Sequence, residues 1–360
     1  MHLEKLQLVN FRNYEDARFE FSDKLNSIVG RNGRGKTNLL DAVYYLCMCK
    51  SHFTPNDRPV LRRGGEFIRL VGTYRREERQ DTVVAKVVPG KRKDFERNGR
   101  LHARLMDHIG LYPIVFITPD DTQLAREGSE ERRRFVDNTL CQTDPTYLRN
   151  LVDFNKLLRQ RNALLRQYSE TGHYSRELLD TYDRQMVEPV GYIHQHRERF
   201  VETFSPVFTE FYQRISGGHE PVELVYQTKL GDAPLPALLE PVLERELRLG
   251  RTLVGPHRDD LGFRLNGFPV KRFASQGQLK SFVLALKLAQ YDHLRTSHNL
   301  TPILLLDDIF DKLDTQRVAQ LLELLTEQQF GQIFLTDTDP ERVARVTEQL
   351  QVEKRVIAIE

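Results

Sequence analysis

The stretch SIVGRNGRGKTNLLDAVYYL, residues 27–46, runs from an apolar segment through a glycine-rich turn into an apolar helix. Its middle, GRNGRGKT, fits the phosphate-loop pattern GxxxxGK(S/T) in the strand-to-helix context that the pattern needs. Glycines let backbone N–H groups curl around phosphate oxygens, Lys36 brings a positive charge, and Thr37 offers a hydroxyl oxygen to Mg²⁺. The alternative is a glycine-rich turn that only caps a helix. The predicted nucleotide-binding residues are Gly30, Arg31, Asn32, Gly33, Arg34, Gly35, Lys36 and Thr37.

The composition is that of an ordinary globular protein, with 360 residues, 39% hydrophobic and 29% charged. Lys and Arg total 53 against 51 Asp and Glu, so the bulk charge indicates no polyanion partner and any such surface must come from local clustering. Three cysteines without a CxxC pair argue against a disulfide framework and a structural zinc site. No apolar run approaches the roughly 18 residues of a membrane span. We expect a soluble cytoplasmic protein without a membrane partner.

The periodicity changes along the chain. Alternating apolar residues predict two strands near the start and further strands over residues 67–105, with turns at Pro-Gly and Asn-Gly. Helical spacing dominates from about residue 129 to 216, where Gly217 predicts a stop. The last third alternates strands and helices. The expected fold is therefore α/β: a P-loop ATPase head, made of a mixed β-subdomain and a doubly wound core, with an inserted mainly helical lobe.

This organisation predicts three segments along the chain. Residues 1–110 form the first part of the ATPase lobe, residues 111–240 the inserted helical lobe, and residues 241–360 the second part of the ATPase lobe. The long coiled-coil arms of a chromosome-organising tether are not expected, because the helical stripes are too short and too often interrupted by proline.

A second motif, PILLLDDIFDKLD at 302–314, places acids directly after an apolar strand. The carboxyl ends of parallel strands meet ligands, so we expect Asp307 in the Mg²⁺ shell and Asp308 facing the attacking water. Asp308 and Lys36 are the predicted catalytic residues, and Thr37 and Asp307 the predicted metal ligands. An acidic turn after a core strand is the alternative. About 270 residues separate Lys36 from Asp307, so the ATP site is split in sequence by the helical lobe.

A third element, SQGQ at 275–278, precedes a strongly apolar helix. Serine and glycine at a helix N-terminus can bind an anion through free N–H groups. Taken alone, an ordinary helix N-cap is the favoured interpretation.

The order of these motifs resembles the cassette ATPases of the SMC, Rad50 and RecF group. Within that group the chain resembles the RecF family of bacterial DNA replication and repair proteins over essentially its full length. The segments that carry this resemblance are LVNFRNYED, GRNGRGKTNLLDAVYYL, KSHFTPNDRPVLRRG, VFITPDDTQLAREGSEERRRFVD, LVGPHRDDLGFRLNG, FASQGQLKS, LLLDDIFDKLD and GQIFLTDTD.

The resemblance implies an ATP- and Mg²⁺-dependent switch with weak, DNA-stimulated ATPase activity. ATP would close a homodimer in which Ser275, Gly277 and Gln278 of one chain face the phosphates held by the other. The closed dimer would clamp double-stranded or gapped DNA. It would act with RecO and RecR to load RecA at single-strand gaps, in repair, replication restart and the SOS response.

Several positions depart from the cassette pattern. Asp308 stands where most cassette ATPases place Glu, which fits a switch better than a fast enzyme. Thr336 and Thr338 stand where other families have a switch histidine, and Thr336 is a candidate γ-phosphate sensor. Lys312, in DKLD at 311–314, stands where the family tends to show Glu. Gln123 is the candidate for the usual Mg²⁺-shell glutamine. The 255–260 segment, GPHRDD, has no assigned chemistry; a polar turn or an ion-paired surface is the alternative to a functional role.

Basic residues predict where DNA could lie. The possible DNA-contacting residues are Lys91, Arg92, Lys93 and Arg97. The alternative is a solvated face paired with nearby acids, and Arg132, Arg133 and Arg134 could equally form intrahelical pairs. A competing function is a generic ABC-type ATPase subunit that drives a non-DNA partner. A subunit of this kind that energises transport and grips a membrane partner should show a histidine after the strand at 332–335 and an LSGGQ element, and the sequence has neither.

Overall fold

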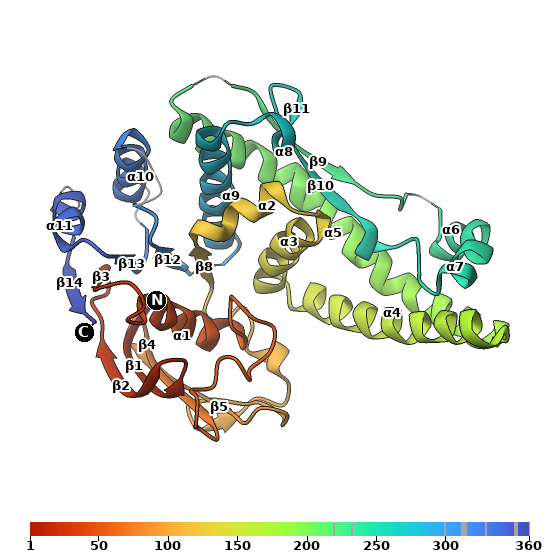
Figure 1. The fold of residues 1–360 in the computed structure, drawn as a ribbon, viewed down its shortest axis with the longest axis horizontal. Helices are drawn as coiled ribbons and strands as arrows, with labels where there is room; N and C mark the ends of the chain where they lie inside the picture. Colours follow the sequence, from red (N-terminus) through yellow and green to blue (C-terminus); the bar gives the residue numbers. More distant parts are fainter. Residues whose placement is uncertain are drawn as a thin grey trace. The chain divides into compact units, whose positions relative to one another are not determined.

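The structure is a computed structural model that describes residues 1–218, 220–231, 233–298, 300–310, 315–327, 330–348 and 352–359. The chain forms two compact units (Figure 1). Unit 1 comprises residues 1–122, 211–218 and 280–360, and unit 2 comprises residues 123–210 and 219–279. The three-part division expected from the sequence stays a prediction. The compact units differ from it in grouping residues 241–279 with the helical insertion, because β10 pairs with β9 in one small sheet.

An antiparallel sheet fills one side of unit 1. Its strands, in the order β2-β1-β4-β5-β6-β7, are β1 (His2–Phe11), β2 (Tyr14–Glu20), β4 (Ile68–Arg76), β5 (Arg79–Val87), β6 (Asp94–Arg97) and β7 (Arg100–Leu101). Asn98 and Gly99, with φ of 52° and 73°, make the two-residue turn between β6 and β7. Both residues tolerate the left-handed region, which such a turn requires. The predicted β-rich start and its Asn-Gly turn are confirmed.

A parallel sheet holds the motif-bearing strands of unit 1. Its strands, in the order β14-β3-β13-β12-β8, are β3 (Leu25–Val29), β8 (Ile114–Ile117), β12 (Ile303–Asp307), β13 (Ile333–Asp337) and β14 (Lys354–Ala358). In register, Thr336 of β13 lies opposite Asp307 of β12 on one side and Ile28 of β3 on the other. The carboxyl ends of the three strands therefore meet at one edge, as expected for a doubly wound sheet.

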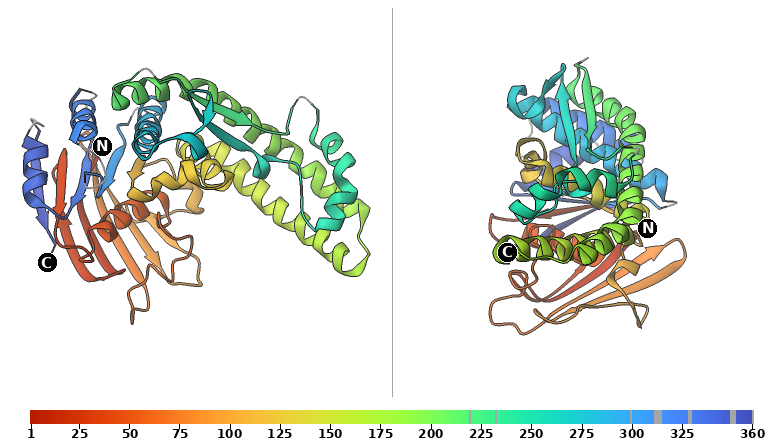
Figure 2. Two further views of the ribbon diagram at one scale, coloured as in Figure 1. Left: turned by 45° about the horizontal axis from the view of Figure 1, so that its top comes forward. Right: turned by 90° about the vertical axis from the view of Figure 1, so that its right-hand side faces the viewer.

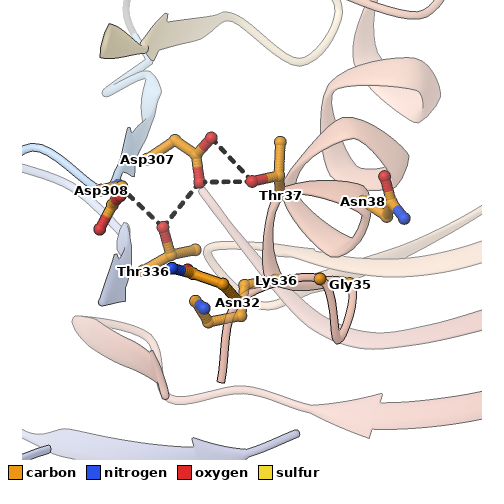
Figure 3. A pocket seen from close by; sticks show the side chains of 9 residues that line it. Asn32, Gly35, Lys36, Thr37, Asn38, Asp307, Asp308 and Thr336 are labelled. Atoms are coloured by element: carbon orange, nitrogen blue, oxygen red, sulfur yellow. Dashed lines mark hydrogen bonds between the residues drawn. The ribbon is translucent and has the colours of Figure 1, made fainter. Parts of the chain in front are cut away.

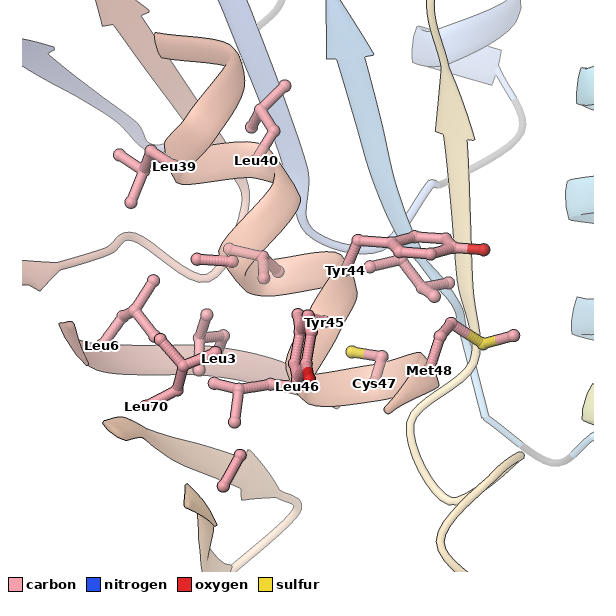
Figure 4. Close-up of a cluster of buried hydrophobic side chains, with 14 of the residues drawn as sticks. Leu3, Leu6, Leu39, Leu40, Tyr44, Tyr45, Leu46, Cys47, Met48 and Leu70 are labelled. Carbon is pink, nitrogen blue, oxygen red and sulfur yellow. The ribbon is translucent and has the colours of Figure 1, made fainter. Parts of the chain in front are cut away.

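The helix α1 (Lys36–Met48) lies between the two sheets, and almost all of its residues are buried. Figure 4 shows its apolar side chains beside those of β1 and β4, with Tyr44 and Met48 pointing toward the parallel sheet. A helix buried all round needs apolar residues on every face. Gln332 also links the sheets, since its side-chain amide bonds both backbone groups of Leu3 at 2.7 Å. This core fixes the position of the helix N-terminus.

The remaining helices of unit 1 follow the sheet strands. They are η1 (Leu105–Asp107), η2 (Pro119–Thr122), α10 (Thr315–Glu327), α11 (Pro340–Glu348) and most of α9 (Gln276–Ser297), which begins in unit 2. The apolar strand predicted before the acids at 307 and 308, the strand predicted at 332–335 and the helix predicted after SQGQ are confirmed within one or two residues.

Unit 2 is mainly helical. Its elements are α2 (Gln123–Arg126), α3 (Ser129–Thr143), α4 (Pro145–Thr171), α5 (Arg176–Ser216, which ends in unit 1), β9 (Val222–Gln227), α6 (Leu235–Leu239), η3 (Glu240–Val242), α7 (Leu243–Leu249), η4 (Pro256–Arg258), β10 (Asp260–Leu265), β11 (Phe268–Pro269) and α8 (Val270–Phe273). The two long helices are visible in Figure 2: α4 has 27 residues and α5 has 41.

The ends of these helices follow capping rules. Asp144 accepts a bond from the backbone N–H of Thr146 and starts α4 just before Pro145. The helix α5 continues through Pro189 and Pro206 and stops before Gly217, whose φ is 63°. The predicted glycine stop is confirmed. Among the described helices, none combines the length and apolar character that crossing a membrane requires.

Candidate functional site

A pocket of about 160 Å³ opens in unit 1 where the glycine-rich loop meets the ends of β12 and β13 (Figure 3). Its lining residues are Asn32, Gly33, Gly35, Lys36, Thr37, Asn38, Asp307, Asp308 and Thr336. The two motifs predicted to share one site therefore come together in a single unit of the chain.

Two glycines of the loop are required by its geometry. Gly35 has φ of 109°, and a Cβ there would collide with the amide of Asn13. A Cβ on Gly30 would collide with the backbone carbonyl of Ile359, just beyond β14. Left-handed backbone and close backbone approach both favour a residue without a Cβ. The spacing of the glycines thus reflects the path of the loop between two neighbouring segments.

The Lys36 ammonium lies inside the loop that it closes. Its Nζ donates to the carbonyl of Gly30 at 2.8 Å and to that of Arg31 at 3.1 Å, and the residue is 7% exposed. Lysine carries three N–H donors, and the same donors can bind phosphate oxygens. Arg31 and Arg34 are exposed and do not line the pocket.

Thr37 and Asp307 bring two hard oxygen donors together. The Thr37 hydroxyl lies 3.0 Å from Oδ1 and 2.9 Å from Oδ2 of Asp307, whose side chain is buried (Figure 3). Burial raises the pKa of Asp307, while hydrogen bonds from Thr336 and Thr37 oppose that shift. A hydroxyl and a carboxylate are the donor types that Mg²⁺ prefers, so these residues fit a Mg²⁺ site.

Asp308 and Thr336 form the far wall of the pocket. The backbone N–H of Asp308 donates to the Thr336 hydroxyl at 2.9 Å, and this hydroxyl donates to Oδ1 of Asp307 at 2.7 Å. Asp308 has φ of 49°, in the left-handed region. The Thr336 hydroxyl thus bonds both acidic residues. The role of Thr336 as a sensor of the γ-phosphate stays a prediction. The DKLD segment at 311–314 lies outside the described residues.

Sequence reasoning missed the residues that support the loop from the turn between β1 and β2. Asn13 Nδ2 donates to the Arg34 carbonyl at 2.9 Å, and the Tyr14 hydroxyl donates to the Gly35 carbonyl at 3.0 Å. Asn38 Nδ2 donates to Asn13 Oδ1 at 2.7 Å. The polar turn NFRNYED was visible in the sequence. That it faces the glycine-rich loop depends on the packing of α1 between the sheets.

Ser275, Gly277 and Gln278 lie in unit 2, at the start of α9. Ser275 N–H donates to Gln278 Oε1 at 2.8 Å, and Gln278 N–H donates to the Ser275 hydroxyl at 3.2 Å. This reciprocal pair is a capping box. The N-cap interpretation is therefore correct, and Ser275 is exposed. The contact of Ser275, Gly277 and Gln278 with a second chain stays a prediction. Gln123 begins α2 of unit 2, and its metal role stays a prediction.

The four candidate DNA-contacting residues divide into two kinds. Lys91 and Arg92 are exposed, although Arg92 also bonds the carbonyl of Ala103. Lys93 instead pairs with Asp57 at 2.8 Å, and Arg97 pairs with Asp81 at 2.7 Å.

The basic run on α3 is held by partners within unit 2. Arg134 pairs with Glu130 at 3.3 Å and Glu131 at 2.8 Å, which agrees with the intrahelical alternative. Arg132 instead pairs with Asp260 at 2.8 Å.

The 255–260 segment is the centre of a buried polar network in unit 2. Asp259 accepts bonds from Arg197 at 3.0 Å, Tyr226 at 2.6 Å and Thr228 at 2.7 Å. Arg197 also bonds the carbonyl of Pro256 at 2.7 Å. The segment thus ties α5 to the small sheet, which is a structural role that its sequence did not reveal.

The chain matches known proteins along nearly its whole length. The model of the RecF/RecN/SMC N terminal domain matches residues 2–358. The DNA replication and repair protein RecF of Flavobacterium johnsoniae is 42% identical over 346 residues, which cover 96% of both chains. RecF of Porphyromonas gingivalis is 42% identical over 362 residues, covering 100% of this chain and 98% of that relative.

Solved structures give the same result for the fold. The recombination mediator protein RecF of the RecFOR pathway, solved as RecF-ATPrS, is similar with a TM-score of 0.88 and 27% identity, covering 100% of this chain and 96% of that one. Its RecF-ATP form has a TM-score of 0.87 at 27% identity, and the match covers 99% of this chain and 95% of that one. The Smc head domain of Pyrococcus furiosus shares the fold alone, with a TM-score of 0.58 and 17% identity. The match covers 100% of this chain and 94% of that one.

Proposed function

This chain belongs to the RecF family of DNA replication and repair proteins, and on that premise we propose that it is an ATP-gated DNA clamp. ATP binding would join two copies around double-stranded or gapped DNA, and slow hydrolysis would release them. The single observation that carries the proposal is the convergence of Lys36, Thr37 and Asp307 on one pocket, from segments 270 positions apart.

The pocket suits the phosphates of ATP. The Lys36 ammonium would leave the loop carbonyls and bind phosphate oxygens instead. The backbone N–H groups of the loop would bind the other phosphate oxygens. Thr37 and Asp307 would hold Mg²⁺, which neutralises negative charge on the phosphates when it is bound. Asp308, at the pocket wall, would orient the attacking water, so Asp308 and Lys36 are the proposed catalytic residues.

A second copy would complete the site. The pocket volume of about 160 Å³ is below the several hundred Å³ that usually enclose a small ligand. Ser275 is exposed, at the N-terminus of a 22-residue helix, where the helix dipole favours an anion. We place Ser275, Gly277 and Gln278 of one chain against the nucleotide of the other.

The wider role follows from the family. Relatives act in DNA replication and repair by name, and one is a recombination mediator of the RecFOR pathway. We propose that this chain likewise works with RecO and RecR to load RecA at gaps, in the cytoplasm. Exposed Lys91 and Arg92 are the proposed phosphate contacts on DNA, whereas the internal ion pairs of Lys93 and Arg97 make these two less suited to that role.

Size-exclusion chromatography with light scattering tests the proposal. The wild-type chain is run with and without ATP and a gapped duplex, and we expect monomers alone, dimers with ATP, and a DNA-bound dimer with both. Asp308→Asn should accumulate the dimer because hydrolysis is slowed. DNA binding that is indifferent to ATP, with no dimer trapped by Asp308→Asn, would contradict the clamp. An ATP-dependent dimer that ignores DNA would instead favour the generic ATPase subunit.

Two variants separate the halves of the composite site. Lys36→Ala should lose ATP binding, with Lys5→Ala on the exposed face of β1 as its control. Ser275→Arg should keep ATP binding and lose the dimer, because it pushes a bulky cation into the partner's phosphate site. Ser169→Arg, on the exposed side of α4, is the matched control. If Lys36→Ala and Ser275→Arg behaved alike in nucleotide binding, the composite site would be wrong.

A further inference from the structure

We infer that Thr336 is a positioning residue for ATP hydrolysis, which holds Asp308 and Asp307 in their working arrangement through one hydroxyl group. The inference rests on the proposed ATPase function and names a residue that this function does not itself require. It differs from the sequence-based prediction that Thr336 senses the γ-phosphate directly.

The sheet topology brings Thr336 to this place. β13 lies between β12, which carries the acids, and β3, which leads into the glycine-rich loop. In register, Thr336 is directly opposite Asp307. A side chain at this position of the middle strand therefore reaches the acids without any loop in between, and a strand holds it more rigidly than a loop would.

The single hydrogen of the Thr336 hydroxyl is committed to a bond inside the protein. It donates to Asp307 Oδ1 at 2.7 Å and accepts from the Asp308 backbone N–H at 2.9 Å (Figure 3). A hydroxyl has one hydrogen to donate, so a bond to a phosphate oxygen would require breaking the bond to Asp307. Thr336 is also 0% exposed. These contacts are those of a residue that positions Asp307 and Asp308.

The bond to Asp308 fixes an unfavourable backbone conformation. Asp308 has φ of 49°, and a residue with a Cβ stays in this region only where its surroundings hold it there. The N–H that Thr336 accepts belongs to the peptide that sets the direction of the Asp308 side chain. Without the hydroxyl, this peptide can relax, and the carboxylate then moves from the place where it would orient water.

The residues proposed to bind ATP and Mg²⁺ keep other contacts when the Thr336 hydroxyl is removed, although Asp307 Oδ1 then loses one hydrogen bond. Thr37 bonds both oxygens of Asp307, and Lys36 bonds two loop carbonyls; none of these bonds involves Thr336. Loss of the Thr336 hydroxyl should therefore affect the rate of hydrolysis much more than the affinity for ATP. If Thr336 instead bound the γ-phosphate directly, loss of its hydroxyl should lower the hydrolysis rate and the ATP affinity together.

The test uses steady-state ATPase assays and ATP titrations on the full chain, with Mg²⁺ and without DNA. Thr336→Val keeps the shape and removes the hydroxyl, and we expect kcat to fall about tenfold, roughly the value of one lost hydrogen bond, with KM and ATP affinity within about twofold. Thr336→Ser, which keeps the hydroxyl, should retain most of the rate. Thr347→Val, at a buried threonine of α11 bonded to its own helix, should change neither value.

A double-mutant cycle identifies the target of the hydroxyl. In the Asp308→Asn background, Thr336→Val should lower the remaining rate by less than about twofold, because both changes act through one group. Additive losses, a matching loss of ATP affinity, or an unchanged kcat would each overturn the inference. If Thr336→Val does not fold, Thr336→Ala removes the same hydroxyl without adding volume. Failure of the wild-type chain to bind ATP would instead contradict the proposed function.

Discussion

The hydroxyl of Thr37 lies 2.9 Å from Oδ2 of Asp307, although 270 positions separate the two residues in the chain. Thr37 is the second residue of α1, and Asp307 is the last residue of β12. Their meeting requires α1 to be packed between the two sheets and β12 to be next but one to β3. Thr37 and Asp307 therefore meet only when β3, α1, β13 and β12 have packed together.

This relationship predicts the effect of changing Thr37. Thr37→Val removes the hydroxyl oxygen and should weaken the binding of Mg²⁺-ATP about tenfold or more, because a metal ligand is lost. Thr37→Ser keeps the oxygen and should bind nearly as the wild type does. Titration of a fluorescent ATP analogue with Mg²⁺ and with EDTA measures both. Equal affinities for the valine and serine variants would show that the hydroxyl holds no metal.

Gly35 should be more sensitive to a side chain than Gly33. Both have positive φ, at 109° and 79°, but only a Cβ on Gly35 meets another residue, the amide of Asn13. Gly35→Ala should cost about 1–3 kcal/mol in the free energy of unfolding and displace the loop. Gly33→Ala, with nothing within 4 Å of its Cβ, carries only the backbone cost. Urea titration compares them, and equal losses would refute the role of Asn13.

The buried network of unit 2 should dominate its stability. Asp259 is 1% exposed and bonds Arg197, which is 3% exposed. Asp259→Asn leaves part of a buried positive charge without its partner and should lower the free energy of unfolding by about 3 kcal/mol. Arg134→Ala, which breaks only exposed pairs on α3, should cost less than about 1 kcal/mol. Thermal and urea denaturation of both variants measure the difference. Similar losses would mean that the 255–260 segment is not a structural centre.

The buried His108 should make stability depend on pH. Burial lowers the pKa of His108 to about 4, and its Nε2 lies 2.7 Å from the Leu46 carbonyl. The folded state therefore keeps the ring neutral, while the unfolded chain takes up a proton near pH 6.5. This contribution to stability is complete above about pH 6.5 and is lost as the pH falls toward 4, by about 2 kcal/mol at pH 5.

His108→Gln should remove that part of the pH dependence. Urea midpoints at pH 7.5 and pH 5 give the comparison, and the variant should lose less stability on acidification than the wild type. His173→Gln, at an exposed histidine in unit 2, is the control and should leave the pH dependence unchanged. If His108→Gln lost as much stability between pH 7.5 and pH 5 as the wild type, the pH dependence would come from other titrating groups.

Two neighbouring lysines should separate DNA contact from stability. Lys91 is exposed, so Lys91→Ala should weaken DNA binding and reduce the slope of log affinity against log salt by about 1. Lys93 pairs with Asp57 and lies 5.0 Å from the centre of the Tyr45 ring. Lys93→Ala should therefore lower stability by about 1–2 kcal/mol and leave the salt slope unchanged. Fluorescence anisotropy at several salt concentrations tests both. The reverse pattern would place Lys93, and not Lys91, on the DNA.

Local sequence was sufficient wherever a property depends on neighbouring residues. We predicted the loop with Lys36 and Thr37, the acids at the end of β12, and the glycine stop after α5. Backbone conformation and apolar periodicity are both visible in the local sequence. The order of these motifs resembled that of the cassette ATPases, and eight quoted segments carried the resemblance to the RecF family. The helix N-cap at Ser275 was also predicted, and the structure adds the bond that Gln278, three positions later, returns to it.

Only the tertiary structure decided which distant residues meet. The placement of β13 between β3 and β12 brings Thr336 onto the acids, and the turn with Asn13 reaches the loop because α1 packs between two sheets. The same holds for Asp259, whose partners lie on α5, on β9 and directly after β9. Such contacts arise from strand order and packing, which no local pattern encodes, so polar residues that look alike in the sequence become ligands, supports or buried partners only after folding.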